Sequence, residues 1–218
     1  MVKKIQPMLW AGVILLAAVL SACTLADLFR PVPSATPTPP TIVPYASIPG
    51  IVLGDATAPI TVEEYVDFQC LACGAFTLGT MQQIREKYVQ PGKVKLVFYH
   101  YPFIGDESFR AAEASECAND QGKFWEYADL LFQNQAGENQ GAFSDTQLAS
   151  FARQLKLDVE QFKTCLADQR HLSAIQASLD DGNARGVYSV PTLFINGQMV
   201  RGVLSLESFE QHLAPYLK

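Results

Sequence analysis

The stretch ITVEEYVDFQCLACGAF, residues 60–76, decides the fold. Residues 60–68 are rich in β-branched and aromatic side chains and are short enough for a buried strand. They run directly into Cys70-Leu71-Ala72-Cys73, after which apolar residues recur at helical spacing as far as Tyr88. The sequence therefore predicts a strand that ends at a CxxC pair, with the pair at the start of a helix.

The position of this pair predicts its chemistry. A cysteine at the start of a helix lies where unpaired N–H groups and the helix dipole favour negative charge. This environment lowers the thiol pKa and increases the fraction of thiolate, which is the nucleophile. The two-residue spacer brings the second cysteine close enough to attack a mixed disulfide formed by the first. We therefore assign Cys70 as the nucleophile and Cys73 as the resolving thiol.

A metal site or a structural bridge is the alternative for the same pair. Zinc normally takes four ligands, and the sequence contains neither a second CxxC nor an HxxxH pair. A Cu(I) site needs only two thiolates and stays open as an alternative. The strand-to-helix placement favours redox chemistry, so we expect no metal and no cofactor.

The pattern on either side of this stretch predicts the rest of the domain. A second strand is predicted at 93–101, and a turn at Asn196-Gly197 joins strand signals at 192–195 and 198–203. Helical spacing is found at 107–119, 123–134, 146–155, 159–166, 172–179 and 206–217. The order predicts an α/β domain with a helical block inserted between the second and third core strands.

Composition limits the classes of function. A length of 218 residues fits one medium domain with appendages, and 49% apolar residues argue against a disordered chain. The net charge of −6 leaves no basic excess for nucleic acid, so we expect no nucleic-acid partner. The five cysteines are therefore the candidates for function.

The amino end has the pattern of an export signal. Lys3 and Lys4 precede an apolar run at 8–20, which is too short to span a membrane comfortably but fits a secretory signal. The run ends in Leu20-Ser21-Ala22-Cys23, which resembles a bacterial lipobox. This resemblance implies a lipoprotein signal peptide at 1–22 and lipidation of Cys23. An uncleaved anchor helix, or an ordinary signal with an incidental cysteine, is the alternative.

A proline-rich segment follows the signal. Residues 30–49 contain seven of the thirteen prolines, which favour extended backbone over a packed core. We therefore expect a lipidated, proline-rich tether at 23–49 and a folded domain at 50–218. At ~3.1 Å per residue, twenty such residues could hold the domain up to about 60 Å from its anchor.

Two further cysteines lie in the helical block. Cys165 follows Val159 and Phe162 on an apolar helix face, so we expect Cys117 and Cys165 near the core of the insertion. An exported, oxidising setting favours pairing, and we expect a structural disulfide between them. Two buried free thiols, or a second redox pair that exchanges electrons with Cys70, are the alternatives.

Four segments together resemble the DsbA-like branch of the thioredoxin superfamily. They are GDATAPITVEEYVDFQCLACGAF at 54–76, Tyr101-Pro102, QGKFWEYADLLF at 121–132 and SVPTLFINGQMVRG at 189–202. The resemblance covers residues 50–218. It implies a thioredoxin fold with an inserted helical domain at about 104–187, and thiol–disulfide exchange on exported proteins.

The resemblance also implies roles for residues outside the cysteine pair. Pro191 is the cis-proline that faces the active-site disulfide, and Val190 binds substrate backbone beside it. Leu71 and Ala72, between the cysteines, are expected to contact substrate as well. The best-known oxidases of the family have proline and histidine at these two positions, so one source of thiolate stabilisation is absent from this chain.

Glu64 is a candidate for proton transfer. On the predicted strand it shares a face with Val62 and Val66, so its carboxyl should point into an apolar layer. Such a group has a raised pKa and could exchange protons with Cys73. The resemblance agrees, since an acidic residue six positions before the first cysteine lies beneath the active site in the family. An edge glutamate that reaches solvent, or pairs with a lysine, is the alternative.

These features predict a lipid-anchored enzyme on the extracytoplasmic face of a bacterial membrane. We expect it to be a monomer that oxidises cysteines in unfolded or reduced exported proteins. By the resemblance, a membrane quinone-linked partner reoxidises it. A disulfide reductase or isomerase, and a copper-binding lipoprotein of the same fold, are the alternative functions.

Overall fold

The computed structural model describes residues 48–217. The predicted signal peptide at 1–22, Cys23 and the tether as far as residue 47 lie outside the described residues. Among the residues that are described, no helix is both long and apolar enough to cross a membrane.

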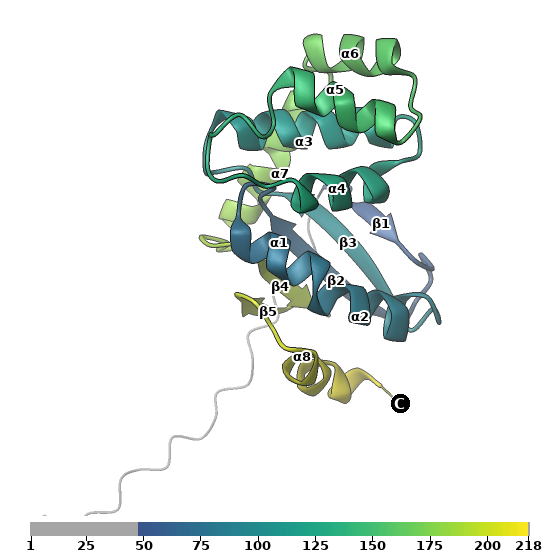
Figure 1. Ribbon diagram of the computed structural model, residues 1–218. Helices are drawn as coiled ribbons and strands as arrows, with labels where there is room; N and C mark the ends of the chain where they lie inside the picture. The colour runs from purple at the N-terminus through teal and green to yellow at the C-terminus, as the bar shows by residue number, and fades with distance from the viewer. Residues whose placement is uncertain (1–47, 218) are drawn as a thin grey trace, which may run out of the picture. The chain divides into compact units, whose positions relative to one another are not determined.

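A mixed sheet lies at the centre of the described domain (Figure 1). Its strands are β1 (Ile51–Leu53), β2 (Ile60–Val66), β3 (Val94–His100), β4 (Thr192–Ile195) and β5 (Gln198–Arg201). They are arranged in the order β1-β3-β2-β4-β5, with β2 and β3 parallel and the other neighbours antiparallel. Every residue of β2 is buried, as is typical of a strand covered on both faces.

The helices that follow the cysteine pair, together with the last helix of the domain, pack on one face of this sheet. They are α1 (Leu71–Leu78), α2 (Thr80–Ile84), which continues into a π-helical turn at Arg85–Val89, and α8 (Leu206–Leu213), which ends in a 3₁₀ turn. The sequence predicted one continuous helix after the cysteines, and that prediction is wrong at Gly79. Gly79 has φ −108° and ψ −97°, and a Cβ there would lie 2.8 Å from the carbonyl oxygen of Ala75.

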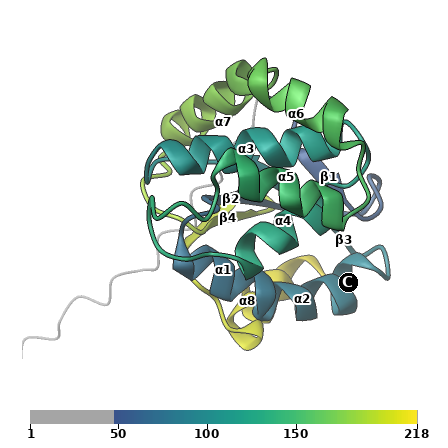
Figure 2. The same ribbon diagram turned by 45° about the horizontal axis from the view of Figure 1, so that its top comes forward.

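A helical block is inserted between β3 and β4, and most of it lies beyond one end of the sheet (Figures 1 and 2). It consists of α3 (Asp106–Asn119), α4 (Phe124–Gln133), α5 (Asp145–Gln154), α6 (Val159–Ala167) and α7 (Leu172–Ala184). The predicted α/β class and the position of the insertion are confirmed, because β3 and β4 are the second and third of the predicted strands. The additional strand β1 was not predicted, since three residues are too short for a periodic pattern.

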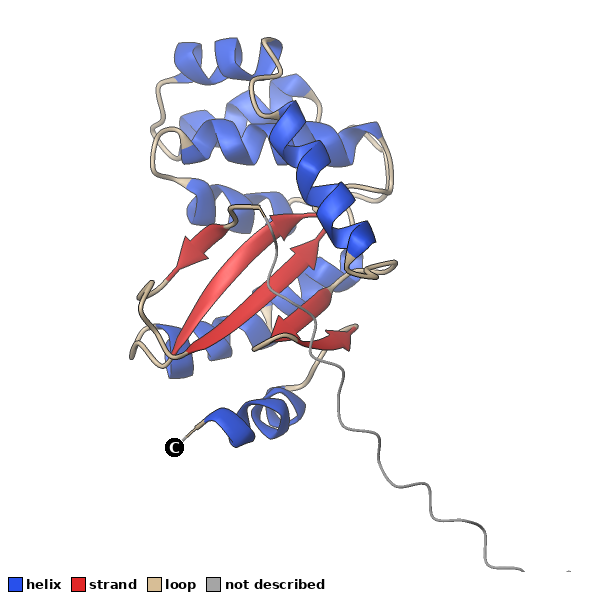
Figure 3. Ribbon diagram, turned by 180° about the vertical axis from the view of Figure 1, so that it is seen from behind, coloured by secondary structure: helices blue, strands red, loops and turns tan. Residues whose placement is uncertain are grey.

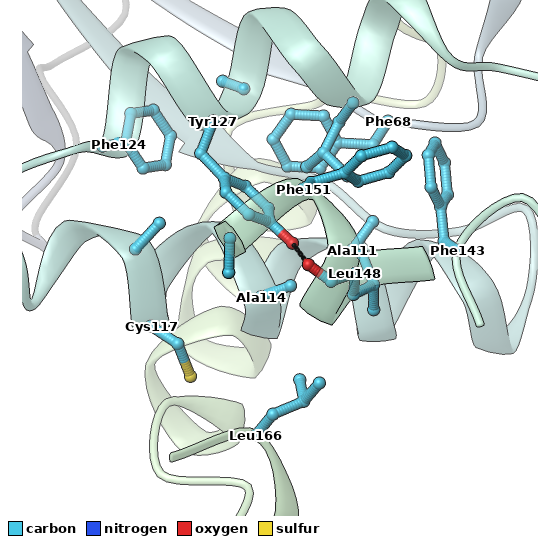
Figure 4. Close-up of a cluster of buried hydrophobic side chains, with 14 of the residues drawn as sticks. Phe68, Ala111, Ala114, Cys117, Phe124, Tyr127, Phe143, Leu148, Phe151 and Leu166 are labelled. Carbon is cyan, nitrogen blue, oxygen red and sulfur yellow. Dashed lines mark hydrogen bonds between the residues drawn. The ribbon is translucent and has the colours of Figure 1, made fainter. Parts of the chain in front are cut away.

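The inserted helices share one apolar core with the end of the sheet that leads into the cysteine pair (Figure 4). Phe68, which follows β2, packs in this core with residues of α3, α4 and α5. The hydroxyl of Tyr127 donates to the carbonyl oxygen of Leu148 over 2.8 Å, which links α4 to α5. Cys117 in α3 is bonded to Cys165 in α6, and both residues are buried. The insertion is therefore held by apolar packing and by a covalent bond between two of its helices.

A separate network fastens α7 to the opposite face of the sheet, which Figure 3 shows from behind. Arg185, directly after α7, forms two hydrogen bonds to the carboxylate of Glu63, at 2.7 and 3.1 Å. Arg185 also donates to the hydroxyl of Tyr65, which donates in turn to Asp181 in α7. The insertion is thus attached to the sheet through the shared apolar core and through the hydrogen bonds at the end of α7.

Replacing Cys117 and Cys165 together by Ala is expected to lower the free energy of unfolding. A bond between residues 48 positions apart stabilises by roughly 4 kcal/mol in the chain-entropy model, less if strained. Urea unfolding followed by circular dichroism measures the loss. The alkylation rate of Cys70 is the control and should not change. Unaltered stability together with a lost Cys70 reaction would instead support the second redox pair.

Candidate active site

Cys70 and Cys73 are free thiols at the start of α1. Cys70 is the N-cap residue with extended backbone, φ −70° and ψ 113°, and its sulfur accepts a hydrogen bond from the backbone N–H of Cys73 over 3.4 Å. Cys70 is half-buried, whereas Cys73 is fully buried. The geometry thus distinguishes one accessible sulfur from one that only an intramolecular reaction can reach.

The two thiols are shifted in opposite directions. The pKa of Cys70 is lowered to about 7, first by a hydrogen bond from the Cys73 side chain and then by backbone N–H groups of Cys73 and Ala72, while burial opposes the shift. Burial, together with the neighbouring Cys70, raises the pKa of Cys73 well above its ordinary value. Near neutral pH, therefore, Cys70 is substantially thiolate and Cys73 is protonated.

The peptide bond between Val190 and Pro191 is cis and lies beside the reactive sulfur. The Cys70 thiol is 3.6 Å from the carbonyl oxygen of Val190, to which it donates. Leu71 and Ala72 are exposed on the first turn of α1, with Leu71 63% accessible. The structure therefore brings together Cys70, Cys73 and Pro191, and it leaves the dipeptide between the cysteines open to a partner.

Asp67 organises the loop that leads into the cysteine pair. Its Oδ1 accepts from the backbone N–H of Gln69 (2.8 Å) and the hydroxyl of Ser108 (2.7 Å). Its Oδ2 accepts from the backbone N–H groups of Phe103 (2.9 Å) and Ile104 (3.1 Å). Asp67 is buried, so these four donors replace the water that the carboxylate has lost.

Gln135, in the loop between α4 and α5, is bonded to the turn that carries the nucleophile. Its Nε2 donates to the carbonyl oxygens of Phe68 (2.7 Å) and Cys70 (3.0 Å). The first turn of α1 leaves space for it at Gly74, where a Cβ would lie 2.3 Å from Gln135 Oε1. The inserted domain therefore positions the backbone of the reactive cysteine.

The sequence analysis did not identify Asp67 or Gln135. The sequence pattern could have indicated Asp67, since an aspartate at the end of a buried strand commonly accepts a hydrogen bond from the backbone N–H two residues ahead. No pattern indicated Gln135, because it is 65 residues from the carbonyl group it contacts and belongs to a segment without a motif.

Glu64 lies on the α1 side of the sheet and is 1% exposed. It does not reach solvent, so the alternative of a solvent-exposed edge glutamate is wrong. Burial raises the pKa of Glu64 to about 7, while the charge of Arg85 acts to lower it and that of Asp129 to raise it. A carboxyl with this pKa can both give and take a proton near neutral pH.

The four cysteines within residues 48–217 form two groups. The free thiols of Cys70 and Cys73 are the pair that could hold a soft ion such as Cu(I). Cys117, Cys165 and His171 place their donor atoms within 4.8 Å of one another, but the two sulfurs are bonded to each other. That bond leaves no thiolate for a metal at the second group.

Comparison with known proteins gives consistent similarities. A family model described as Thioredoxin matches residues 46–214. The probable disulfide bond formation protein D of Bacillus cereus is 32% identical over 151 residues, which are 67% of this chain and 70% of that protein. The crystal structure of oxidised BdbD from Bacillus subtilis has a TM-score of 0.72 at 25% identity, and the match covers 80% of this chain and 97% of that one. The expected thioredoxin fold is thereby confirmed.

A third similarity is confined to part of a longer protein. The Na(+)/H(+) antiporter NhaA 1 of Salinispora arenicola is 35% identical over 159 residues, which are 72% of this chain and 23% of the antiporter. Only that portion of the antiporter is therefore related to the domain described above.

The hydrogen bond from the Cys73 side chain gives a specific expectation for Cys70. Replacing Cys73 by Ala removes the donor and should move the pKa of Cys70 from about 7 upward toward that of a free thiol. Replacing Cys73 by Ser keeps a donor and should give a smaller increase. The pH dependence of iodoacetamide alkylation measures both variants. Midpoints that stay near 7 in both variants would show that the backbone N–H groups alone set the value.

Proposed function

The chain belongs to the DsbA-like thiol–disulfide oxidoreductases of the thioredoxin family, and on this basis we propose that it oxidises cysteines of exported proteins to disulfides. The observation that carries the proposal is the contrast between an accessible Cys70 of lowered pKa and a buried Cys73 of raised pKa. This contrast suits a disulfide that is attacked only at Cys70.

The proposed reaction has two exchange steps. A substrate thiolate attacks the sulfur of Cys70 in the Cys70–Cys73 disulfide, which forms a mixed disulfide and releases Cys73 as a thiolate that takes up a proton. A second substrate thiolate then attacks the substrate sulfur of the mixed disulfide and expels the Cys70 thiolate. The substrate loses two electrons, and the Cys70–Cys73 pair gains them.

The surroundings of Cys70 suit an unfolded protein substrate. Exposed apolar side chains occur on the segments that form the site: Leu71 (63% accessible), Phe103 (52%) and Tyr188 (71%). Val190 offers backbone groups beside the sulfur, and Leu71 and Ala72 face outward. Unfolded chains present both apolar side chains and unpaired backbone, so a surface of this kind can bind many sequences.

The environment of Cys70 also favours the oxidising direction. A dithiol protein is an oxidant when its reduced form is the more stable, and stabilisation of the Cys70 thiolate contributes to that form. This stabilisation of the reduced form is fully present above the ordinary pKa of a thiol. It is lost as the pH falls through about 7, which is the pKa of Cys70 in the folded protein. Since Leu71 and Ala72 add no side-chain donor, we propose an oxidase of moderate strength.

The proposed setting is the extracytoplasmic face of a bacterial membrane. The lipobox-like segment before Cys23 and the proline-rich residues 30–49 support a lipid anchor and a tether for the domain at 50–218. We propose that a membrane quinone-linked protein withdraws the electrons from reduced Cys70 and Cys73, and that the enzyme works as a monomer.

Oxidase activity is tested on a reduced, unfolded protein that recovers activity only when its disulfides form. The wild-type protein should accelerate recovery, and Cys70→Ala should abolish the effect. Cys73→Ala, supplied with oxidised glutathione as the oxidant, should accumulate mixed disulfides at Cys70, because the thiol that would release them is missing. Glutathione titration should give a potential above the value of about −270 mV typical of thioredoxin. A potential at or below that value would reassign the protein as a reductase.

The anchor is tested with Cys23→Ser in the full chain. The wild-type protein should fractionate with membranes, and mass spectrometry of its amino end should find Cys23 as the first residue, carrying acyl groups. The variant should be released or remain unprocessed. An unmodified Cys23, or a mature protein that begins elsewhere, would rule out the lipoprotein assignment.

A further inference from the structure

Glu64 lies between two apolar residues of the sheet. Its neighbours in the sheet are Phe98 on β3 and Leu193 on β4, which carry no charge. Cys73 belongs to the same buried cluster as Val66 and Phe98. Glu64 Oε2 is buried and has no hydrogen-bond partner. The stability of its charged form therefore depends on more distant charges, since no donor contacts this oxygen.

A partly buried ion pair supplies those charges. Arg85, in the π-helical turn after α2, is 8% exposed and donates through Nη1 to both carboxylate oxygens of Asp129 in α4, at 3.0 and 3.2 Å. Its guanidinium carbon is 5.1 Å from the ring centre of Trp125, and its Nε is buried without a partner. Arg85 is thus held in place by α4, and part of its donor capacity is unused.

The ion pair lies at the border with solvent. Arg85 and Trp125 line a pocket of about 310 Å³ together with Leu53, Gln82 and Val89. The side chain of Asp129 is 28% exposed, compared with 10% for Arg85. The more deeply buried member of the pair is therefore the cation. Its positive charge is screened less than the charge of its partner.

The two charges act on Glu64 in opposite directions. The positive charge of Arg85 favours the carboxylate form, and the negative charge of Asp129 favours the protonated form. The charges that act on Glu64 are those of Arg85 and Asp129, whereas Glu86, Lys87 and Glu126 on the same helices are exposed to solvent. Burial alone would keep the Glu64 carboxyl protonated at neutral pH. In that state the carboxyl could donate a proton but could not accept one.

We propose that Arg85 and Asp129 are positioning residues whose opposed charges keep Glu64 able both to donate a proton to Cys73 and to accept one from it. This inference rests on the proposed function. When a substrate opens the disulfide, Glu64 gives its proton to the Cys73 thiolate and becomes a carboxylate beside Arg85. When the disulfide reforms, the carboxylate takes the proton of Cys73, and the resulting thiolate attacks Cys70 in the mixed disulfide.

The test uses the two single variants Arg85→Gln and Asp129→Asn, which break the same ion pair and leave opposite charges behind. The carboxyl titration of Glu64 is followed by NMR in ¹³C-labelled reduced protein, with Glu64→Gln to identify the signal. The midpoint should rise by about one pH unit in Arg85→Gln and fall by a similar amount in Asp129→Asn, a tenfold change each way in the ratio of the two forms.

A kinetic measurement connects this titration to the reaction. A mixed disulfide of Cys70 with a small aromatic thiol releases that thiol when Cys73 attacks, and the release rate is recorded against pH. Its midpoint should shift in the same direction as that of Glu64 in each variant. Arg85→Lys should keep the midpoint close to that of the wild-type protein, because the positive charge is retained. Lys87→Gln, which breaks the exposed ion pair with Glu210, is the matched control and should leave both midpoints unchanged.

The outcomes separate this inference from the proposed function. Shifts in the same direction in both variants, or no shift in either, would overturn the charge mechanism and leave only a structural role for the pair. Opposite shifts of the Glu64 titration with an unchanged release profile would overturn the role of Glu64 in proton transfer. The NMR titration does not require disulfide exchange, so it remains informative even if the oxidase assay fails.

Discussion

The backbone N–H of Cys73 donates to the sulfur of Cys70 at the first turn of α1, and this contact requires several other features of the molecule. Cys70 must be extended while the residues after it are helical, so β2 has to end just before the pair. The carboxylate of Asp67 holds that junction from one side, and the amide of Gln135 holds it from the other. The inserted helical domain is therefore part of the active site, because it provides one of the two supports.

The adjacent residues Glu63 and Glu64 show how strand geometry gives similar side chains different roles. Successive side chains of a strand point to opposite faces of the sheet. Glu63 faces α7 and is bonded to Arg185 at 2.7 Å, which fixes the insertion to the sheet. Glu64 faces α1 and retains a buried oxygen without a partner. One glutamate contributes to the architecture, and the other is left free to titrate.

The features that the sequence predicted are those encoded over short distances. The order of strands and helices, the CxxC pair at a helix start and the inward direction of Glu64 all follow from periodicity within one element. The residues that support the site cannot be predicted in this way. Gln135 contacts Cys70 across 65 residues, and Arg85 contacts Asp129 across 44. Such pairs arise only when the insertion closes over α1 and α2, and no local pattern specifies that closure.

Proton balance links these observations. Opening the disulfide creates two sulfur centres that can carry negative charge, and the start of α1 stabilises the charge on only one of them. The pKa of Cys73 lies well above its ordinary value because of burial, so its charge cannot persist in the core. A proton donor must therefore lie nearby, and Glu64, with its pKa raised to about 7 by the same burial, is suited to that task. In the mechanism proposed above, the negative charge then passes to the carboxylate of Glu64, which the positive charge of Arg85 stabilises.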